Sequence, residues 1–238
     1  MCIRDSGYTV LFHHNALLTS KIMNQVDWTY DAFENANILV DDSNSYWFVS
    51  PEKFPNGWED MYAYAMEAPG QLKMGCSPGS YQHLLKIIIN ELTGMEPTLV
   101  DAGDAATSAI ECIAGRLDTM SCSLTAVKDY VESGQLIPIA TYRSERNTKD
   151  APDCPTWKEL GYDVYGGYLY GTHFPLGTDQ RIIDKWNDAC ANAAKSQVVQ
   201  EAYERYNAEE LFITGEDATA RWDAMWNDFM QYEEYFPW

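Results

Sequence analysis

The sequence lacks long hydrophobic runs and is poor in basic residues. The chain has 238 residues, and no apolar run in it reaches the length of about 18 residues that a membrane-spanning helix needs. Lysine and arginine number 16 against 36 aspartate and glutamate residues, so the formal net charge is −20. Such a chain has no basic footprint for nucleic acid, and anionic membrane surfaces do not attract it. Binding to nucleic acid or to a membrane surface is therefore disfavoured.

Common catalytic and cofactor motifs are missing as well. There is no Gly-Lys-Ser/Thr phosphate loop, no GxGxxG fingerprint, no GxSxG elbow and no HExxH. The six cysteines form no CxxC pair, and Cys112 and Cys122 have no histidine nearby, so metal-ligand spacing is absent. We expect each cysteine to be a small buried hydrophobic residue, although one disulfide stays open if the protein is exported. The sequence predicts no cofactor and no metal.

Apolar residues, at 46%, are plentiful enough for a sizeable core in one or two domains. Short extended segments alternate with segments of helical apolar spacing. Strands separated by helices predict βαβ units and a mainly parallel sheet, which places the chain in the α/β class. The expected strands are 8–12, 46–50, 72–75, 98–101, 117–121, 137–142, 164–174 and 211–213, and the expected helices are 16–23, 58–67, 80–93, 105–114, 124–132, 178–195, 198–206 and 215–234.

The order of elements indicates two lobes. Residues 73–168 read as self-contained βα units. Extended segments flank this block at 71–75 and 164–174, where the chain could cross between lobes as a pair. The later helices would then return to the first lobe.

The amino terminus has an unusual sequence. Met1–Ser6 resembles a translated adaptor, so we expect residues 1–6 to be foreign to the protein. No apolar run follows a basic start, so these residues are not a signal peptide. An expected strand follows at once, and a domain rarely opens so abruptly. We therefore expect the natural amino terminus, with any signal peptide, to be missing from this chain.

The strongest local feature is the strand–turn–helix segment at residues 75–83. It contains Ser77, Gly79, Ser80 and His83 around the expected helix start. Backbone N–H groups and the positive dipole end of such a start can hold an anion, and serine hydroxyls add donors. The alternative is that Gly79 and Ser80 only turn the chain and cap the helix.

Three other places follow expected strands, where ligands bind in open α/β sheets. Asn15 follows the first strand and could donate its amide N–H to a ligand or cap the next helix. The turn 101–106 contains Gly103 and Ala105, and Asp104 there is a natural cap. Ser121 could reach a shared cleft or belong to a helix cap.

Several short motifs, in their order along the chain, resemble the solute-binding proteins of tripartite tricarboxylate transporters. The series covers the chain from Gly7 to its end, and its order is more specific than any one motif. It consists of GYTVLF at 7–12, PGQL at 69–72, GSYQHL at 79–84, GRLD at 115–118, GQL at 134–136, PDCPT at 152–156, ELGY at 159–162 and GTHFPLGT at 171–178.

This resemblance implies a periplasmic binding protein fold of type II, with two α/β lobes around a cleft. The first lobe would comprise residues 7–72 and 171–238 and be incomplete at its amino terminus, and the second would comprise 73–170. The resemblance implies a carboxylate held in the second lobe by Ser77, Gly79, Ser80 and His83. It also implies a contribution from Asn15 of the first lobe, with Gly103 and Ala105 facing the same cleft. The family usually has glycine where this chain has Ser77.

The function implied is periplasmic capture of a small carboxylate for the membrane subunits of a tripartite transporter. We expect a monomer without catalysis, whose lobes close around the ligand. We also expect this chain to bind weakly or not at all, because the family's first βαβ unit precedes Gly7. Two alternatives stay open: a periplasmic ligand sensor for a signalling receptor, and a small α/β thiol hydrolase with Cys76 as nucleophile and His83 as base.

Overall fold

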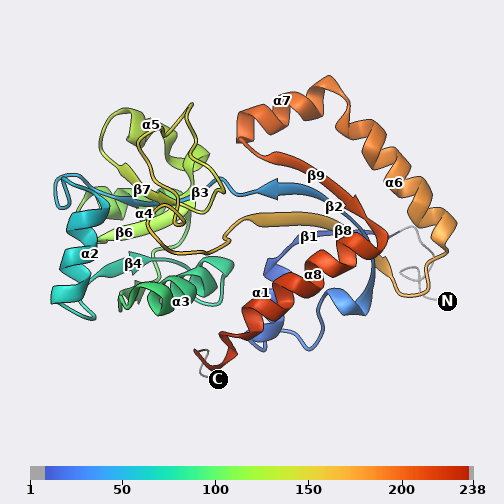
Figure 1. Ribbon diagram of the computed structural model, residues 1–238, viewed down its shortest axis with the longest axis horizontal. Coiled ribbons are helices and arrows are strands. Elements are labelled where there is room, and N and C mark those ends of the chain that lie inside the picture. The colour runs from blue at the N-terminus through green and yellow to red at the C-terminus, as the bar shows by residue number, and fades with distance from the viewer. Residues whose placement is uncertain (1–8, 236–238) are drawn as a thin grey trace. The chain divides into compact units, whose positions relative to one another are not determined.

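The computed structural model describes residues 9–235, which form a mixed α/β fold with two separate sheets. The chain divides into two compact units (Figure 1). Unit 1 contains the chain up to Asp42 and from Tyr168 onward, and unit 2 is Ser43–Gly167. The α/β class expected from the sequence is confirmed.

Unit 1 is built on a four-stranded sheet in the order β1-β8-β2-β9, in which every pairing is antiparallel. Its elements are β1 (Leu11–His14), α1 (Ala16–Ile22), the 3-10 turn η2 (Tyr30–Ala32), β2 (Phe33–Asp42), β8 (Tyr168–Pro175), α6 (Gln180–Ala194), α7 (Gln197–Tyr206), β9 (Glu209–Thr214), α8 (Gly215–Met230) and the 3-10 turn η4 (Glu233–Tyr235).

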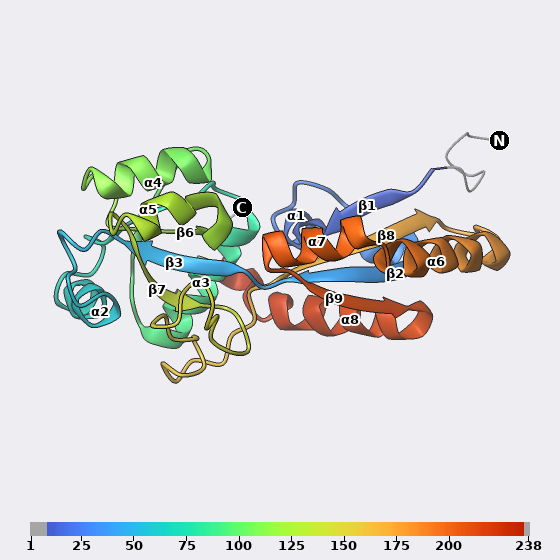
Figure 2. The same cartoon turned by 90° about the horizontal axis from the view of Figure 1, so that it is seen from above.

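Helices pack on both faces of this sheet because β8 alternates its side chains (Figure 2). His173 contacts Trp222 of α8, with ring centroids 5.6 Å apart. The next residue along the strand, Phe174, meets Trp186 of α6 edge to face at 5.9 Å. A Cβ at Gly171 would lie 2.6 Å from the carbonyl oxygen of Asn37, so only glycine allows β2 to approach here. Trp222 is fully buried and anchors α8 to the sheet.

Unit 2 has a five-stranded sheet in the order β5-β4-β6-β3-β7. Strand β4 pairs in parallel with β5 and with β6, whereas β3 pairs antiparallel with β6 and β7. Its elements are β3 (Ser45–Val49), α2 (Trp58–Glu67), β4 (Lys73–Gly75), α3 (Tyr81–Thr93), β5 (Thr98–Val100), α4 (Ala105–Ile113), β6 (Thr119–Ser123), the 3-10 turn η3 (Leu124–Val127), α5 (Lys128–Glu132) and β7 (Ile137–Thr141).

Side chains of β3 point alternately to the two faces of the sheet, and those on both faces contribute to the core of unit 2. Tyr46 and Phe48 belong to a buried cluster with Ala109 and Cys112 of α4. On the other face Trp47 is fully buried, and its indole Nε1 donates to the hydroxyl of Tyr142 at 2.8 Å. Both faces of this central strand are therefore covered, which explains why all five of its residues are buried.

Three sequence expectations about the fold are wrong. The sheets are not mainly parallel, since five of the seven pairings among described strands are antiparallel. The ten-residue strand β2 was not expected at all. Residues 71–75 do not cross between units, because β4 lies inside the sheet of unit 2; the chain passes between units at 42/43 and 167/168. Residues 1–8, with Cys2 and the start of the expected strand 8–12, lie outside the described residues.

The boundary of the second unit also differs from the expected 73–170. Strand β3 and helix α2 were expected in the first lobe, but they lie in unit 2. The reason is pairing, because β3 sits between β6 and β7 and cannot be separated from that sheet.

Replacing Trp222 by alanine tests the anchoring of α8. The change removes a fully buried indole, so the free energy of unfolding should fall by about 3–5 kcal/mol. The matched control is Trp28→Ala, since Trp28 is 40% exposed and should cost under about 1 kcal/mol. Urea unfolding followed by circular dichroism measures both. Equal losses for the two variants would contradict the anchoring role.

Acidification should destabilise unit 1. Burial lowers the pKa of His14 and of His173 to about 4, from an ordinary value of 6.5. Between pH 6.5 and 4 the unfolded chain therefore binds protons that the folded chain does not, and the free energy of unfolding falls as the pH falls. His173→Phe should flatten this dependence. The measurement is the urea midpoint at pH 7.5 and pH 5, and an unchanged difference in the variant would refute the assignment.

Candidate functional site

Three turns meet at one edge of the sheet in unit 2. Because β4 runs parallel to both β5 and β6, the carboxyl ends of the three strands point the same way. The turn 76–80 follows β4, the turn 101–104 follows β5, and β6 ends at Ser123. Ligands of open α/β sheets bind beyond this edge, so these turns form the candidate site.

The turn after β4 begins helix α3. Gly79 has φ of +77°, a left-handed conformation that favours glycine. Ser80 is the N-cap, and its Oγ accepts a hydrogen bond from the backbone N–H of His83 at 3.3 Å. The turn and cap expected for these residues are confirmed. The 13-residue helix directs the positive end of its dipole toward this turn.

His83 faces back to the same turn. The backbone N–H of Gly79 donates to its Nδ1 at 3.2 Å, so the neutral ring carries its proton on Nε2. Burial and, second, the charge of Lys86 lower the pKa of His83. The imidazole is therefore neutral near pH 7 and offers an N–H donor.

The turn after β5 lies against the first one. The hydroxyl of Ser77 donates to the carbonyl oxygen of Gly103 at 3.4 Å. Asp104 caps α4, since its carboxylate accepts from the N–H of Thr107 at 2.8 Å, and Asp101 accepts from the N–H of Gly103 at 3.3 Å. Two carboxylates thus occupy this turn, which makes it a poorer place for an anion than the turn after β4.

A chain of hydrogen bonds connects three elements at this edge. Ser121 of β6 donates to Oε1 of Gln82 at 2.7 Å, and Nε2 of Gln82 donates to the hydroxyl of Ser45 at 3.4 Å. Ser121 is therefore held to the start of α3. Gln82 was not singled out from the sequence, although its place beside His83 at a helix start was a usable signal.

Lys86 was also missed. Its side chain is only 9% exposed, and its ammonium makes no hydrogen bond or ion pair with the residues that the structure describes. The signal was present in the sequence, because Lys86 stands alone in the apolar run from Leu84 to Ile89.

The structure thus brings seven of the eight predicted ligand residues to one edge of one unit. The eighth, Asn15, lies in unit 1, where it is buried at the N-cap position of α1 and makes no side-chain cap bond. The cap expected as its alternative role is thus confirmed in position, but not as a side-chain hydrogen bond. Ligand contact stays a prediction for all eight residues.

The cysteines do not form a nucleophilic site. Burial raises the pKa of Cys76 to about 12, so its sulfur is a thiol at neutral pH. Nδ1 of His83 already accepts from Gly79 and is not available as a base toward that thiol. As expected, Cys76, Cys112, Cys122 and Cys154 are buried and free, while Cys190 is partly exposed. Cys2 lies outside the described residues.

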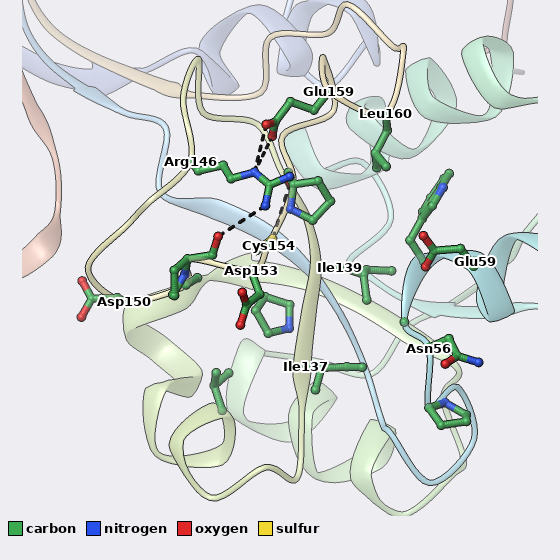
Figure 3. Close-up of a pocket in the computed structure, with 18 residues that line it drawn as sticks. Asn56, Glu59, Ile137, Ile139, Arg146, Asp150, Asp153, Cys154, Glu159 and Leu160 are labelled. Carbon is green, nitrogen blue, oxygen red and sulfur yellow. Dashed lines mark hydrogen bonds and ion pairs between the residues drawn. The ribbon is translucent and has the colours of Figure 1, made fainter.

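A separate pocket of about 680 Å³ lies along β7 in unit 2 (Figure 3). Ile137 and Ile139 stand on the strand that forms its floor. Arg146 is the one basic residue among those that line it, and its Nε donates to both carboxylate oxygens of Glu159 at 2.9 Å. The remaining charged lining consists of Glu59, Asp150 and Asp153.

The charges of this pocket disfavour an acidic ligand. Its guanidinium is neutralised by Glu159, and the carboxylate of Asp150 is paired with Lys128, while Glu59 and Asp153 add negative charge that repels an anion. The edge of β4, β5 and β6 remains the better candidate. Within residues 9–235 no group of histidine, cysteine and acidic side chains could hold a metal ion. None of the helices in that range has both the length and the apolar character to cross a membrane.

Two curated proteins are similar in sequence to this chain. A UPF0065 protein of Cupriavidus necator is 25% identical over 88% of this chain and 64% of its own length. Protein BugT of Bordetella pertussis is 25% identical over 70% of this chain and 51% of its own. The chain therefore spans less than two thirds of the curated relatives that it matches.

Solved structures share the fold. A TctC solute-binding protein from Polaromonas has a TM-score of 0.77 and 24% identity, covering 95% of this chain and 79% of its own. A Rhodopseudomonas palustris protein with adipate has a TM-score of 0.76 and 20% identity, covering 98% and 80%. MatC from Rhodopseudomonas palustris, with bound malate, has a TM-score of 0.73 and 18% identity, covering 99% and 81%.

The family itself is identified by a model for the tripartite tricarboxylate transporter family receptor, which matches residues 4–221. That range covers most of the chain and includes all three turns of the candidate site. The resemblance expected from the ordered motifs is confirmed: this chain belongs to the tripartite tricarboxylate transporter receptor family.

Proposed function

We propose that this protein is a periplasmic solute-binding receptor that captures a small carboxylate and delivers it to the membrane subunits of a tripartite transporter. The carboxylate would bind at the turn after β4, against the start of α3. It acts as a binding protein without catalysis and as a monomer.

The observation that carries this proposal is the chemistry of that turn. The start of a 13-residue helix, the hydroxyl of Ser80 and the Nε2–H of a neutral His83 supply donors at this turn, beside the hydroxyl of Ser77, which donates to Gly103 in this structure. Gly79 in its left-handed conformation keeps the turn tight. The ligand residues proposed in unit 2 are Ser77, Gly79, Ser80, His83, Gly103, Ala105 and Ser121, and Asn15 is proposed from unit 1.

Relatives support a carboxylate as the ligand class. Two proteins of the same fold were solved with adipate and with malate, both of which carry two carboxylates. Membership of a transporter receptor family supports delivery to membrane subunits and a periplasmic location.

Ligand-induced stabilisation tests the function. The protein expressed from its complete gene is melted with malate, adipate, citrate and butyrate in turn. An acid present at about 100 times its dissociation constant adds roughly 2.7 kcal/mol of stability. At about 2–4 °C per kcal/mol for this size, the melting temperature should rise by roughly 5–10 °C.

The control compares two serine N-caps. Ser80→Ala should shrink the ligand-induced shift, whereas Ser196→Ala should leave it unchanged, because Ser196 stands at the N-cap position of α7 in unit 1, where its hydroxyl donates to Ala193. A folded protein that shows no shift with any of the acids would contradict the proposed function.

The behaviour of Cys76 separates binding from thiol catalysis. A thiol with a pKa of about 12 should resist iodoacetamide at pH 8, while partly exposed Cys190 should react before the other four cysteines that the structure describes. Mass spectrometry of the labelled native protein locates the modified residues. Cys76→Ala should also keep carboxylate affinity within a few fold. Rapid alkylation of Cys76 would contradict this prediction and support the thiol hydrolase alternative.

A further inference from the structure

The hydroxyl of Ser121 in β6 is held in one orientation beside the first turn of α3. Its Oγ donates to Oε1 of Gln82 at 2.7 Å, and Gln82 is the second residue of that helix. Nε2 of Gln82 donates in turn to the hydroxyl of Ser45 at 3.4 Å, and Ser45 is buried. The shorter distance is typical of an O–H···O bond, which fits an amide whose carbonyl oxygen faces Ser121. That oxygen cannot donate, so the proton of the bond comes from Ser121.

The oxygen of Ser121 is consequently an acceptor toward any ligand at this edge of the sheet. A serine hydroxyl has one proton and two lone pairs, and Gln82 takes the proton. Within residues 9–235 no group donates to Oγ of Ser121, and the side chain is partly exposed. Turning the proton toward a ligand would break the bond to Gln82, which is costly for a partly buried acceptor. Ser121 therefore complements the turn after β4, where the helix start supplies donors.

We infer that Ser121 accepts a hydrogen bond from a hydroxyl group of the ligand, so that the site prefers 2-hydroxy acids to the same acids without the hydroxyl. This inference rests on the proposed function. The donors of the turn after β4 hold a carboxylate, and Ser121 contacts the group on the next carbon. Gln82 is a positioning residue, because it fixes the direction of the Ser121 proton without touching the ligand.

Membership of the family does not by itself set this preference. Malate has a hydroxyl on the carbon next to a carboxylate, whereas adipate has none, and each was found with a protein of the same fold. The preference inferred for this chain comes from the direction of one hydrogen bond in its own structure.

The competing explanation is structural, since the bond from Ser121 to Gln82 also ties β6 to α3. Loss of a purely structural bond would weaken every ligand alike, or none. Loss of an acceptor for the hydroxyl would weaken only the acids that carry a hydroxyl. The ratio of the affinities for a hydroxy acid and its partner without the hydroxyl therefore separates the two explanations.

Calorimetric titration measures this ratio on protein expressed from the complete gene. The four pairs are malate with succinate, 2-hydroxyadipate with adipate, citrate with propane-1,2,3-tricarboxylate, and 2-hydroxybutyrate with butyrate. Both enantiomers of each chiral hydroxy acid are titrated. Aspartate is added because its ammonium group, in place of the hydroxyl of malate, could donate to the same oxygen.

Two variants are compared with two matched controls. Ser121→Ala removes the acceptor, and Gln82→Met keeps the length of the side chain while freeing the Ser121 proton. The controls are Ser133→Ala and Gln135→Met. Ser133 also donates to a glutamine side chain, at 3.2 Å to Oε1 of Gln135, but both residues are exposed. They precede β7, which runs in the direction of β6, so they lie at the opposite edge of the sheet.

The wild type should bind the hydroxy acid about fivefold to tenfold more tightly than its partner in each pair that binds, the range expected of one uncharged hydrogen bond. Ser121→Ala should bring the ratio to within about twofold by weakening the hydroxy acid alone. Gln82→Met should lower the ratio too, because the freed hydroxyl can also donate to a carboxylate. Both controls should keep the wild-type ratio.

A wild-type ratio near one would overturn the inference and leave the proposed function standing. So would a ratio that survives in Ser121→Ala, an equal weakening of both members of a pair, or aspartate binding more tightly than malate. A wild-type ratio in Gln82→Met would overturn the positioning role of Gln82. A folded wild type that binds none of the acids would overturn the proposed function and this inference together.

Discussion

The parallel direction of β4, β5 and β6 is the constraint on which the candidate site depends. Parallel strands end at the same edge, so three segments far apart in sequence deliver their turns to one place. The hydrogen bond from Ser77 to Gly103 and the one from Ser121 to Gln82 are consequences of that alignment. Antiparallel neighbours would have sent alternate turns to opposite edges, and the same residues would not have met.

Local dipoles explain how a chain of net charge −20 could hold the carboxylate that we propose as its ligand. Salt screens the charges of exposed carboxylates beyond about 8–10 Å, so most of the negative charge is not felt at the site. What matters is what lies within that distance. The turn after β4 presents the start of helix α3, whereas the turn after β5 presents Asp101 and Asp104. The pocket along β7 is lined by four carboxylates, of which Glu159 pairs with Arg146 and Asp150 with Lys128. Carboxylates make both of these other places less favourable for an acid.

Local signals in the sequence predicted local structure well. The helix 58–67 begins and ends where it was expected, and α3 has the expected cap at Ser80 and glycine at Gly94. Strand β2 was missed because half of its ten residues are acidic or amide side chains that disfavour strands. It is a strand because β8 and β9, more than a hundred residues away, pair with both of its edges. The prediction of mainly parallel strands was wrong for the same reason, because the direction of a strand is decided by partners that are distant in the sequence.

For the site, the sequence located the turns but not the side chains that depend on burial. Lys86 is a plausible exposed residue until the fold shows that its face of α3 is covered. The contribution of Gln82 is visible only in the fold, where β6 places Ser121 within hydrogen-bond distance of its side chain. Such residues could not be chosen from spacing, because their environment is made by other elements.

Capping and ligand binding at Ser80 are compatible, although the sequence presented them as alternatives. The cap uses a lone pair of Oγ, which accepts the backbone N–H of His83. The hydroxyl proton is left to donate, and a carboxylate oxygen is a stronger acceptor than the neighbouring sulfur of Cys76. His83 follows the same logic, since Nδ1 accepts from the turn and Nε2 donates. The hydrogen bonds that stabilise this helix start therefore use acceptor atoms of Ser80 and His83, which is compatible with a role of the same residues as donors to an anion.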